Sequence, residues 1–465
     1  MTSRDGGSPI SLFRVLFGER TMQIQNLVAI LFTVSANAVF AQEASNQTLI
    51  TNVNVFDGVN EALIENANVV INGNLIETIS TEPLAVAGGK VIDGGGRTLI
   101  PGLIDAHWHT TYAYTPQSTV VSGDISEVAI RGALGAEKTL MRGFTTIRDT
   151  GGNPFSIKKM IDSGELVGPR ILPSGPPITQ TGGHLDYRPY QAVPMNQGDS
   201  QWYWYANGLM LQADGVPDVI LRTREVMRMG ASQIKIAAGG GVSSLYDPID
   251  VRQYTRAELE AFVEVADTYN TYVLAHIFTD DAAQVAIEAG VKSLEHGMLF
   301  SEETLRMMKE NDVWLSTQPI LNDETALAFD DPVSTAKFLQ VTDGTEKVYQ
   351  LAKEIGVKIA FGTDMLFDPK TAESQTQFLT KLKPWFTPYE ILKMATSDNA
   401  ELLELAGPRH PYQEGPLGEI TEGAYADLIL VNGNPLVDID IVADPHTNFV
   451  LIMKDGVIYK NALEN

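Results

Sequence analysis

Short β-rich runs recur along the middle of the chain, and each is followed by a helix-like or loop segment. The eight runs are Leu103–His109, Thr145–Asp149, Arg170–Ser174, Gln233–Ala237, Tyr272–Ile277, Ser293–His296, Val313–Gln318 and Lys358–Asp364. Between the fourth and fifth runs, Thr255 and Glu258 form a capping-box pattern, and apolar residues at helical spacing follow it. Strands that alternate with helices pair in parallel through right-handed crossovers. We therefore predict an α/β fold whose main part is a (β/α)8 TIM barrel.

The His107-Trp108-His109 motif ends the first of these runs. Because side chains at i and i+2 of a strand point to one face, both imidazoles can reach one metal ion. Four further residues of metal-binding type end strands four, five, six and eight: Lys235, His276, His296 and Asp364. The chemistry of such barrels lies at the C-terminal strand ends. Any one of these residues alone would more often be an ordinary core or surface residue. Together they predict a metal centre, because four of the seven histidines of the chain lie at these ends.

Both ends of the chain differ from its middle. They are rich in short β-runs separated by turn signals, such as Val69–Gly73, Asp427–Gly433 and Leu451–Gly456. We expect residues 46–105 and 407–465 to combine into one small β-sandwich beside a barrel formed by residues 106–406. A chain of 465 residues, 44% hydrophobic and 20% charged, is long enough for both parts.

Six longer motifs are more specific than the single residues. They are LIPGLIDAHWH (99–109), GFTTIRDTGG (143–152), QIKIAAGGGVSS (233–244), VLAHIFTDDAAQVAIEAGVKSLEHG (273–297), FGTD (361–364) and ADLILVNGNPL (426–436). In these motifs the chain resembles the amidohydrolase superfamily, within it the branch of metal-dependent carboxypeptidases, prolidases and ochratoxinase-like amidases. The resemblance implies two metal ions. One is held by His107, His109 and Asp364, the second by His276 and His296, and Lys235 bridges both as an N-carboxylated lysine.

A carboxylated Lys235 also makes chemical sense. Two dications would repel an ammonium group, and a neutral amine is a poor bridge. Reaction with carbon dioxide gives an anionic ligand with two oxygens, and burial and nearby cations favour the neutral amine that this reaction needs. The alternative is a lysine in an ordinary salt bridge. Imidazole and carboxylate ligands favour Zn²⁺, with manganese, cobalt and iron as alternatives.

Hydrolysis follows from such a centre, because two divalent metals supply hydroxide at ordinary pH. Asp364 is the expected proton shuttle, which accepts the proton of the nucleophile and passes it to the departing amine. His184 lies in the loop after the third strand, and it either holds a substrate carbonyl or carboxylate or has no catalytic role. The candidates for contacts with a substrate carboxylate are Tyr187, Arg188, Tyr190 and Tyr246, with Arg148 and Arg252 as further cations.

The favoured function is a binuclear metal amidase that cleaves the amide bond before a C-terminal amino acid. Its substrates would be N-acyl amino acids, Xaa-Pro or other dipeptides, or ochratoxin-like phenylalanine amides. One alternative is a deaminase or an imidazolonepropionase-like hydrolase. Such relatives generally use one metal and lack the lysine of strand four, so Lys235 argues against it. The second alternative is a non-catalytic scaffold, which the complete ligand set disfavours. The chain contains no Gly-x-Ser-x-Gly or His-Glu-x-x-His motif and no cysteine.

The N-terminus predicts a secretory signal peptide over residues 1–41. Arg14 and Arg20 precede the apolar run Leu27–Val34, and small residues lead up to Ala41. An uncleaved anchor is disfavoured because the run is shorter than the ~20 residues that span a bilayer. A start at Met22 would remove the positive charges and weaken this interpretation. Since the chain also lacks a lipobox cysteine, we expect a soluble periplasmic or secreted enzyme.

The formal net charge of the chain is −25. Such a charge repels nucleic acids and anionic membranes, so we expect small-molecule substrates instead. The aromatic run Trp202–Tyr205 either lines an apolar pocket or forms a subunit interface. The family resemblance also implies a homo-oligomer, with an octamer as one candidate.

Overall fold

The computed structural model describes residues 47–192, 203–244, 246–323, 326 and 331–463, which belong to one compact unit. The predicted signal peptide at 1–41 and Trp202 lie outside the described residues. Within the described ranges, none of the helices combines the length and the apolar character that a membrane crossing requires.

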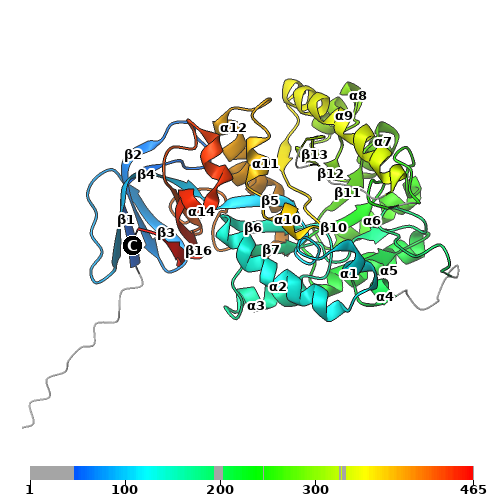
Figure 1. Ribbon diagram of the computed structural model, residues 1–465, viewed down its shortest axis with the longest axis horizontal. Helices are drawn as coiled ribbons and strands as arrows, with labels where there is room; N and C mark the ends of the chain where they lie inside the picture. Colours follow the sequence, from blue (N-terminus) through cyan, green and yellow to red (C-terminus); the bar gives the residue numbers. More distant parts are fainter. Residues whose placement is uncertain (1–46, 193–202, 245, 324–325, 327–330, 464–465) are drawn as a thin grey trace, which may run out of the picture. The chain divides into compact units, whose positions relative to one another are not determined.

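Strands from both ends of the chain form one seven-stranded sheet, so that the first strands lie beside the last ones (Figure 1). Its order is β17-β16-β15-β4-β1-β2-β3, with β1 and β4 parallel and the other neighbours antiparallel. Ile50, Val69, Leu430 and Leu451 pack in one apolar cluster, which ties the two ends together. The strands are β1 (Gln47–Val55), β2 (Ile64–Asn72), β3 (Leu75–Ser80), β4 (Lys90–Pro101), β15 (Leu428–Val431), β16 (Phe449–Lys454) and β17 (Val457–Asn461).

The middle of the chain forms two parallel sheets, ordered β5-β6-β7 and β14-β13-β12-β11-β10-β8-β9. Their strands are β5 (Leu103–Trp108), β6 (Phe144–Asp149), β7 (Arg170–Pro173), β8 (Ile178–Thr179), β9 (Leu211–Gln212), β10 (Ile234–Ala237), β11 (Val273–Ile277), β12 (Ser293–His296), β13 (Trp314–Thr317) and β14 (Ile359–Phe361). Eight of them coincide with the eight predicted runs, most to within one residue at each end. The exception is the end of β14, three residues earlier than predicted. The two-residue strands β8 and β9 were not predicted.

Hydrogen bonds join the two parallel sheets at both edges of the three-stranded one. At the end of β7, the carbonyl oxygen of Pro173 accepts a bond of 2.7 Å from Ser232 N, just before β10. At the other edge, Asp364 N donates to His107 O at 2.8 Å. The buried amide of Asn399 also donates to one carbonyl oxygen of β5 and one of β14. An eight-stranded parallel barrel requires such links at both edges.

Most of the longer helices follow the parallel strands and lie around them (Figure 1). The predicted capping box is present at the start of α6, where Glu258 accepts a bond from Thr255 N. Leu259, Phe262 and Ala266 on the same helix are buried. The helices are α1 (Gln117–Ser122), α2 (Ile125–Met141), α3 (Phe155–Asp162), α4 (Tyr203–Ala206), α5 (Val216–Met229), α6 (Arg256–Thr268), α7 (Asp280–Ala289), α8 (Glu302–Glu310), α9 (Pro332–Ile355), α10 (Pro369–Ala372), α11 (Gln377–Thr380), α12 (Pro388–Lys393), α13 (Asn399–Leu403) and α14 (Pro445–Asn448).

Arg170 on β7 connects the parallel strands to the sheet built from the chain ends. Its Nη1 lies 2.9 Å from both carboxylate oxygens of Asp427, and its Nη2 lies 2.6 Å from Asp455. Arg170 and Asp427 are 2% and 4% exposed. The guanidinium also lies over the ring of Tyr425, 4.1 Å from its centroid. Because both charges of the Arg170–Asp427 pair are buried, each compensates the other.

We expect Arg170→Met to lower the free energy of unfolding by about 3–5 kcal/mol, because Asp427 would remain buried without its partner. Arg228→Met is the matched control. Arg228 pairs with Glu225 on α5, but its side chain is 70% exposed, so the change should stay within about 0.5 kcal/mol. Denaturant unfolding followed by circular dichroism measures both values. Equal effects of the two substitutions would contradict the role given to Arg170.

Candidate active site

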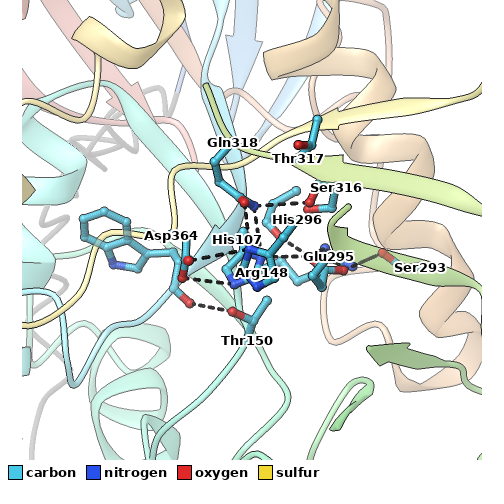
Figure 2. A network of polar contacts seen from close by, with 12 residues as sticks. His107, Arg148, Thr150, Ser293, Glu295, His296, Ser316, Thr317, Gln318 and Asp364 are labelled. Carbon is cyan, nitrogen blue, oxygen red and sulfur yellow. Dashed lines mark hydrogen bonds and ion pairs between the residues drawn. The ribbon is translucent and has the colours of Figure 1, made fainter. Parts of the chain in front are cut away.

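His107, His109 and Asp364 lie together at the C-terminal ends of β5 and β14. One ligand atom from each of the three side chains lies within 4.8 Å of the others. Asp364 Oδ1 is 3.3 Å from His107 Nε2 and 3.1 Å from His109 Nε2, and Figure 2 shows this carboxylate facing the imidazole of His107. The arrangement places an acidic ligand between the two imidazoles of the His-x-His motif.

The other three predicted ligands line the same cavity. His296 is the last residue of β12, and its ring centroid lies 5.0 Å from that of His107 and 4.4 Å from that of His276 on β11. His296 Nδ1 is 3.7 Å from Asp364 Oδ2. Lys235, on β10, is 4% exposed and lines the cavity with these histidines. The structure thus brings all six predicted ligands to one place.

Each histidine of this cluster has one ring nitrogen engaged by a neighbour that is not one of the six. The contacts are His107 Nδ1 with Glu295 Oε2 (2.7 Å), His109 Nδ1 with Gly151 O (3.2 Å), His276 Nε2 with Gly240 O (3.1 Å) and His296 Nδ1 with Gln318 Oε1 (2.8 Å). Such contacts fix the orientation of a ring and leave its second nitrogen for a metal. Gln318 Nε2 also lies 3.3 Å from His107 Nδ1, so one amide contacts two of the rings (Figure 2).

The pKa shifts of His276, His296 and Asp364 suit metal binding. Burial lowers the pKa of His296 to about 3, and burial together with neighbouring histidines places the pKa of His276 well below its usual range. Burial alone would raise the pKa of Asp364, but His107 holds that pKa well below its ordinary value. Burial lowers the pKa of Lys235 to about 8. Neutral imidazoles and an ionised carboxylate are the forms that bind divalent metals, so this donor set fits them.

Four residues that line the cavity have left-handed backbone conformations although none is glycine. They are Leu185 (φ 76°), His296 (φ 73°), Asp364 (φ 52°) and Phe367 (φ 65°). Each such residue costs about 1–3 kcal/mol, and such strain concentrates at functional sites. Two of the four are predicted metal ligands, so the turns that direct these ligands inward are strained.

A buried ion pair holds the carboxylate that contacts His107. Arg148 on β6 contacts both carboxylate oxygens of Glu295 on β12, at 2.8 and 2.9 Å, and both residues are completely buried (Figure 2). Burial alone would raise the pKa of Glu295, but the Arg148 charge and the bond from His107 hold it well below its ordinary value. Glu295 was not predicted from the sequence, although an acid next to the predicted ligand His296 in a buried strand is a readable signal. Arg148, a candidate cation for a substrate carboxylate, is instead completely buried and pairs with Glu295, which contacts His107.

His184 lies in the cavity beside the predicted metal ligands. Its ring stacks on that of His276, with 3.9 Å between centroids and 12° between planes. Its Nδ1 is 2.8 Å from Asp247 Oδ2 and 2.8 Å from Ser244 Oγ. His184 is a predicted site residue, whereas its two partners, Asp247 and Ser244, carry no signal in the sequence.

The other predicted substrate contacts are scattered. Tyr187 lines the cavity, and its hydroxyl lies 3.0 Å from Ser243 Oγ. The remaining four do not line the cavity as described: Arg188 pairs with Asp186 (2.5 Å), Arg252 pairs with Asp281 (3.4 Å), and Tyr190 and Tyr246 are 88% and 44% exposed. Within the aromatic run, Trp204 and Tyr205 pack behind the cavity wall against Tyr112 and Met210.

The cavity itself has a volume of about 500 Å³ and is mainly apolar. Among the described residues that line it, Lys235 is the only lysine or arginine. The apolar lining consists of Val120, Pro177, Leu185, Met210, Val242, Phe278, Met298, Ile320, Ala326, Phe338, Val341, Leu366 and Phe367. A cavity of this size accommodates a small organic molecule.

Comparisons with known proteins place this geometry in a family. The profile of the amidohydrolase family matches residues 98–461. Ochratoxinase of Aspergillus niger is 34% identical over 376 residues, which cover 78% of this chain and 75% of ochratoxinase. A solved prolidase complexed with N-methylphosphonate-L-proline is 32% identical with a TM-score of 0.82, over 89% of this chain and 100% of the prolidase. A Xaa-Pro dipeptidase with bound methionine is 29% identical with a TM-score of 0.77, over 89% and 100%.

These matches confirm the resemblance that the sequence motifs indicated. The family profile spans most of the chain, and the matched residues include all six predicted ligands. The chain is therefore a hydrolase of C–N bonds that belongs to the amidohydrolase family.

Proposed function

We propose that this protein is a binuclear metal-dependent amidohydrolase that cleaves the amide bond before a C-terminal amino acid. The observation that carries the proposal is the convergence of four histidines, Asp364 and Lys235 on one apolar cavity. Ochratoxinase, a prolidase and a Xaa-Pro dipeptidase, the relatives by sequence and structure, are named for related substrates. We also infer that the two parallel sheets close into a (β/α)8 barrel, with the seven-stranded sheet as part of a second, β-sandwich domain.

The chain offers two adjoining sets of ligands. His107, His109 and Asp364 would hold one metal, and His276 and His296 the second. Lys235 would bridge both after its Nζ forms a bond to the carbon of CO₂, one π pair of CO₂ moves to oxygen, and the nitrogen loses a proton to solvent. Burial favours this reaction, because a pKa of about 8 leaves part of Lys235 uncharged at neutral pH. A bound pair of divalent ions, for which we propose Zn²⁺, supplies hydroxide at neutral pH and polarises the substrate carbonyl.

Asp364 is positioned to move the proton of the reaction. Its carboxylate is ionised, and its two oxygens face different histidines, Oδ1 toward His107 and His109 and Oδ2 toward His296. It accepts the proton of the nucleophile and donates it to the nitrogen of the departing amine, which is otherwise a poor leaving group. His184, beside His276, hydrogen-bonds the substrate carbonyl or carboxylate.

The apolar lining favours substrates with apolar groups on either side of the amide. N-acyl amino acids, Xaa-Pro and other dipeptides, and ochratoxin-like phenylalanine amides have this character. Since Lys235 is the only lysine or arginine among the described lining residues, the metals would provide the positive field for a substrate carboxylate, and His184 a hydrogen bond. An apolar wall also excludes water, which strengthens these electrostatic interactions.

Metal analysis combined with a substrate library tests this function. We expect about two metal ions per chain, and hydrolysis of at least some members of a library of dipeptides and N-acyl amino acids. Exhaustive chelation should abolish this activity, and Zn²⁺ with bicarbonate should restore it. One ion per chain with activity on cyclic amidines would favour the deaminase alternative. A protein without metal or turnover would favour the scaffold.

Two further proposals concern the protein in its cell. We propose that residues 1–41 direct export to the periplasm or the medium and are then removed, which mass measurement of the exported protein would show as a chain that begins near Gln42. We also propose a homo-oligomer, which light scattering of the purified protein would reveal as a mass that is a multiple of the chain mass. A monomeric mass, or an uncleaved chain retained in the cytoplasm, would contradict these two proposals.

A further inference from the structure

A chain of buried charged groups leads from helix α9 to the active-site cavity. Lys337 on α9 is 8% exposed, and Asp247, in the loop after β10, is completely buried. Lys337 Nζ lies 3.6 Å from Asp247 Oδ1, while Asp247 Oδ2 lies 2.8 Å from His184 Nδ1. The proposed reaction uses only His184 of these three residues. Burying an aspartate and a lysine is costly unless they are paired, so their presence beside the cavity requires an explanation.

The loop that carries Asp247 is fixed in three ways. Lys337 Nζ donates to the carbonyl oxygens of Gly241, Ser244 and Asp247, at 3.0, 2.8 and 2.9 Å. Gly241 N donates to Asp247 Oδ2 at 2.7 Å. A Cβ on Gly241 would lie only 2.0 Å from His184 Nδ1, so glycine is needed here for the His184 ring to fit. The last glycine of the run after Lys235 thus serves the packing of His184.

We propose that Asp247 and Lys337 are positioning residues that act on the hydrolytic reaction through His184, a proposal that rests on the proposed function. Asp247 accepts a hydrogen bond from His184 Nδ1, which fixes the orientation of the ring and directs its other nitrogen, Nε2, to donate to the substrate. Nε2 has no hydrogen-bonding partner among the described residues. Lys337 compensates the buried charge of Asp247 and holds the loop at the distance that this contact requires.

A second contact couples the orientation of the His184 ring to a neighbouring histidine of the site. Its ring is stacked on His276, which is one of the proposed metal ligands, at 3.9 Å. Rotation of the His184 ring would therefore change both the direction of Nε2 and the packing around His276. The bond to Asp247 opposes this rotation, in the way that a carboxylate orients the histidine of other hydrolytic sites.

A double-mutant cycle separates positioning from plain structural support. If Asp247 acts through His184, it has nothing left to position once His184 is removed. We expect His184→Ala to lower kcat/KM about a hundredfold on the best library substrate and Asp247→Asn to lower it about tenfold or more. The double variant should lie within about twofold of His184→Ala alone. Lys337→Met should follow the same pattern, and metal content should stay at the wild-type value in every variant.

The matched control is Lys353→Met on the same helix. Lys353 also donates to a carbonyl oxygen, that of Trp385, and pairs with a carboxylate, that of Glu390, but it does not line the cavity. It should leave kcat/KM unchanged. Independent, multiplicative losses in the Asp247→Asn and His184→Ala cycle would overturn the inference while leaving the proposed function intact. A wild-type protein that hydrolyses no amide in the library would overturn both. Should Lys337→Met fail to fold, the Asp247 cycle decides alone.

Discussion

Replacing Lys235 with alanine is expected to remove nearly all amide hydrolysis and to reduce the metal content below two ions per chain. Lys235 is 4% exposed, and it contributes no hydrogen bond or ion pair within the described part of the chain. A lysine without a salt bridge in such a place is poorly explained by a structural role. As a carboxylated ligand it would supply the anionic bridge between two dications. Mutating a residue that hydrogen-bonds a metal ligand lowers metal affinity or activity by about 10–100-fold. Loss of a ligand itself should therefore lower kcat/KM by more than about a hundredfold.

Two measurements make this result specific. Metal analysis of the purified variant should show fewer ions than the wild type, and acetate should restore part of the activity, because a short carboxylate fits the space of the lost side chain. Lys309→Ala is the control, since Lys309 on α8 bonds to the Ile355 carbonyl oxygen away from the cavity. Full metal content with wild-type rates in Lys235→Ala would refute the bridging role.

The strands, and the residues that meet at their C-terminal ends, could be predicted from the sequence because both depend on local patterns. Short β-rich runs and their alternation with helical segments are readable along the chain. The residues that end such runs lie at one edge of parallel strands, so His107, His276 and Asp364 could be expected to meet without knowledge of any loop. The two-residue strands β8 and β9 have no such pattern, since two residues show no alternation.

Contacts that cross the molecule were not readable in the same way. Arg148 lies on β6 and Glu295 on β12, two strands that are not neighbours in either sheet. The two side chains nevertheless form an ion pair, and Glu295 contacts His107. The spacing of residues along the chain predicts no partner for Arg148, and for this reason Arg148 was a candidate for binding a substrate carboxylate. The Asp247–Lys337 contact likewise joins a loop after β10 to helix α9, ninety residues later. Such pairs depend on how the elements pack, which spacing along the chain does not encode.

The shape of the cavity also required the structure. Phe338 and Val341 on α9 contribute to its wall together with Phe278 and Met298, from segments far apart in the sequence. At the sequence level these are ordinary apolar residues of amphipathic helices and strand ends. The aromatic run Trp202–Tyr205 was the visible candidate for a pocket wall, but Trp204 and Tyr205 lie one layer behind it. Part of the cavity wall is therefore formed by residues outside the sequence motifs, such as Phe338 and Val341.

Asp364→Asn is expected to lower kcat by about 10³-fold, within the range for loss of a general acid–base group, and to retain much of the metal. Asparagine keeps the size of the side chain but cannot accept and return a proton. The histidines and Lys235 remain as ligands, so metal loss should be smaller than in Lys235→Ala. Steady-state kinetics on an N-acyl amino acid, together with metal analysis, distinguish the two variants: one loses its metals, and the other loses its proton shuttle.

Asp368→Asn provides the matched control, because Asp368 is the other aspartate among the described residues that line the cavity. Its carboxylate instead caps the short helix α10, where it accepts bonds from Lys370 N and Thr371 Oγ1. An asparagine caps nearly as well as an aspartate, so both stability and kcat should change little. If the two substitutions reduced kcat equally, the loss would reflect the charge of the cavity in general. A selective loss in Asp364→Asn identifies the proton carrier, because of these two aspartates only Asp364 contacts the histidines proposed to bind metal.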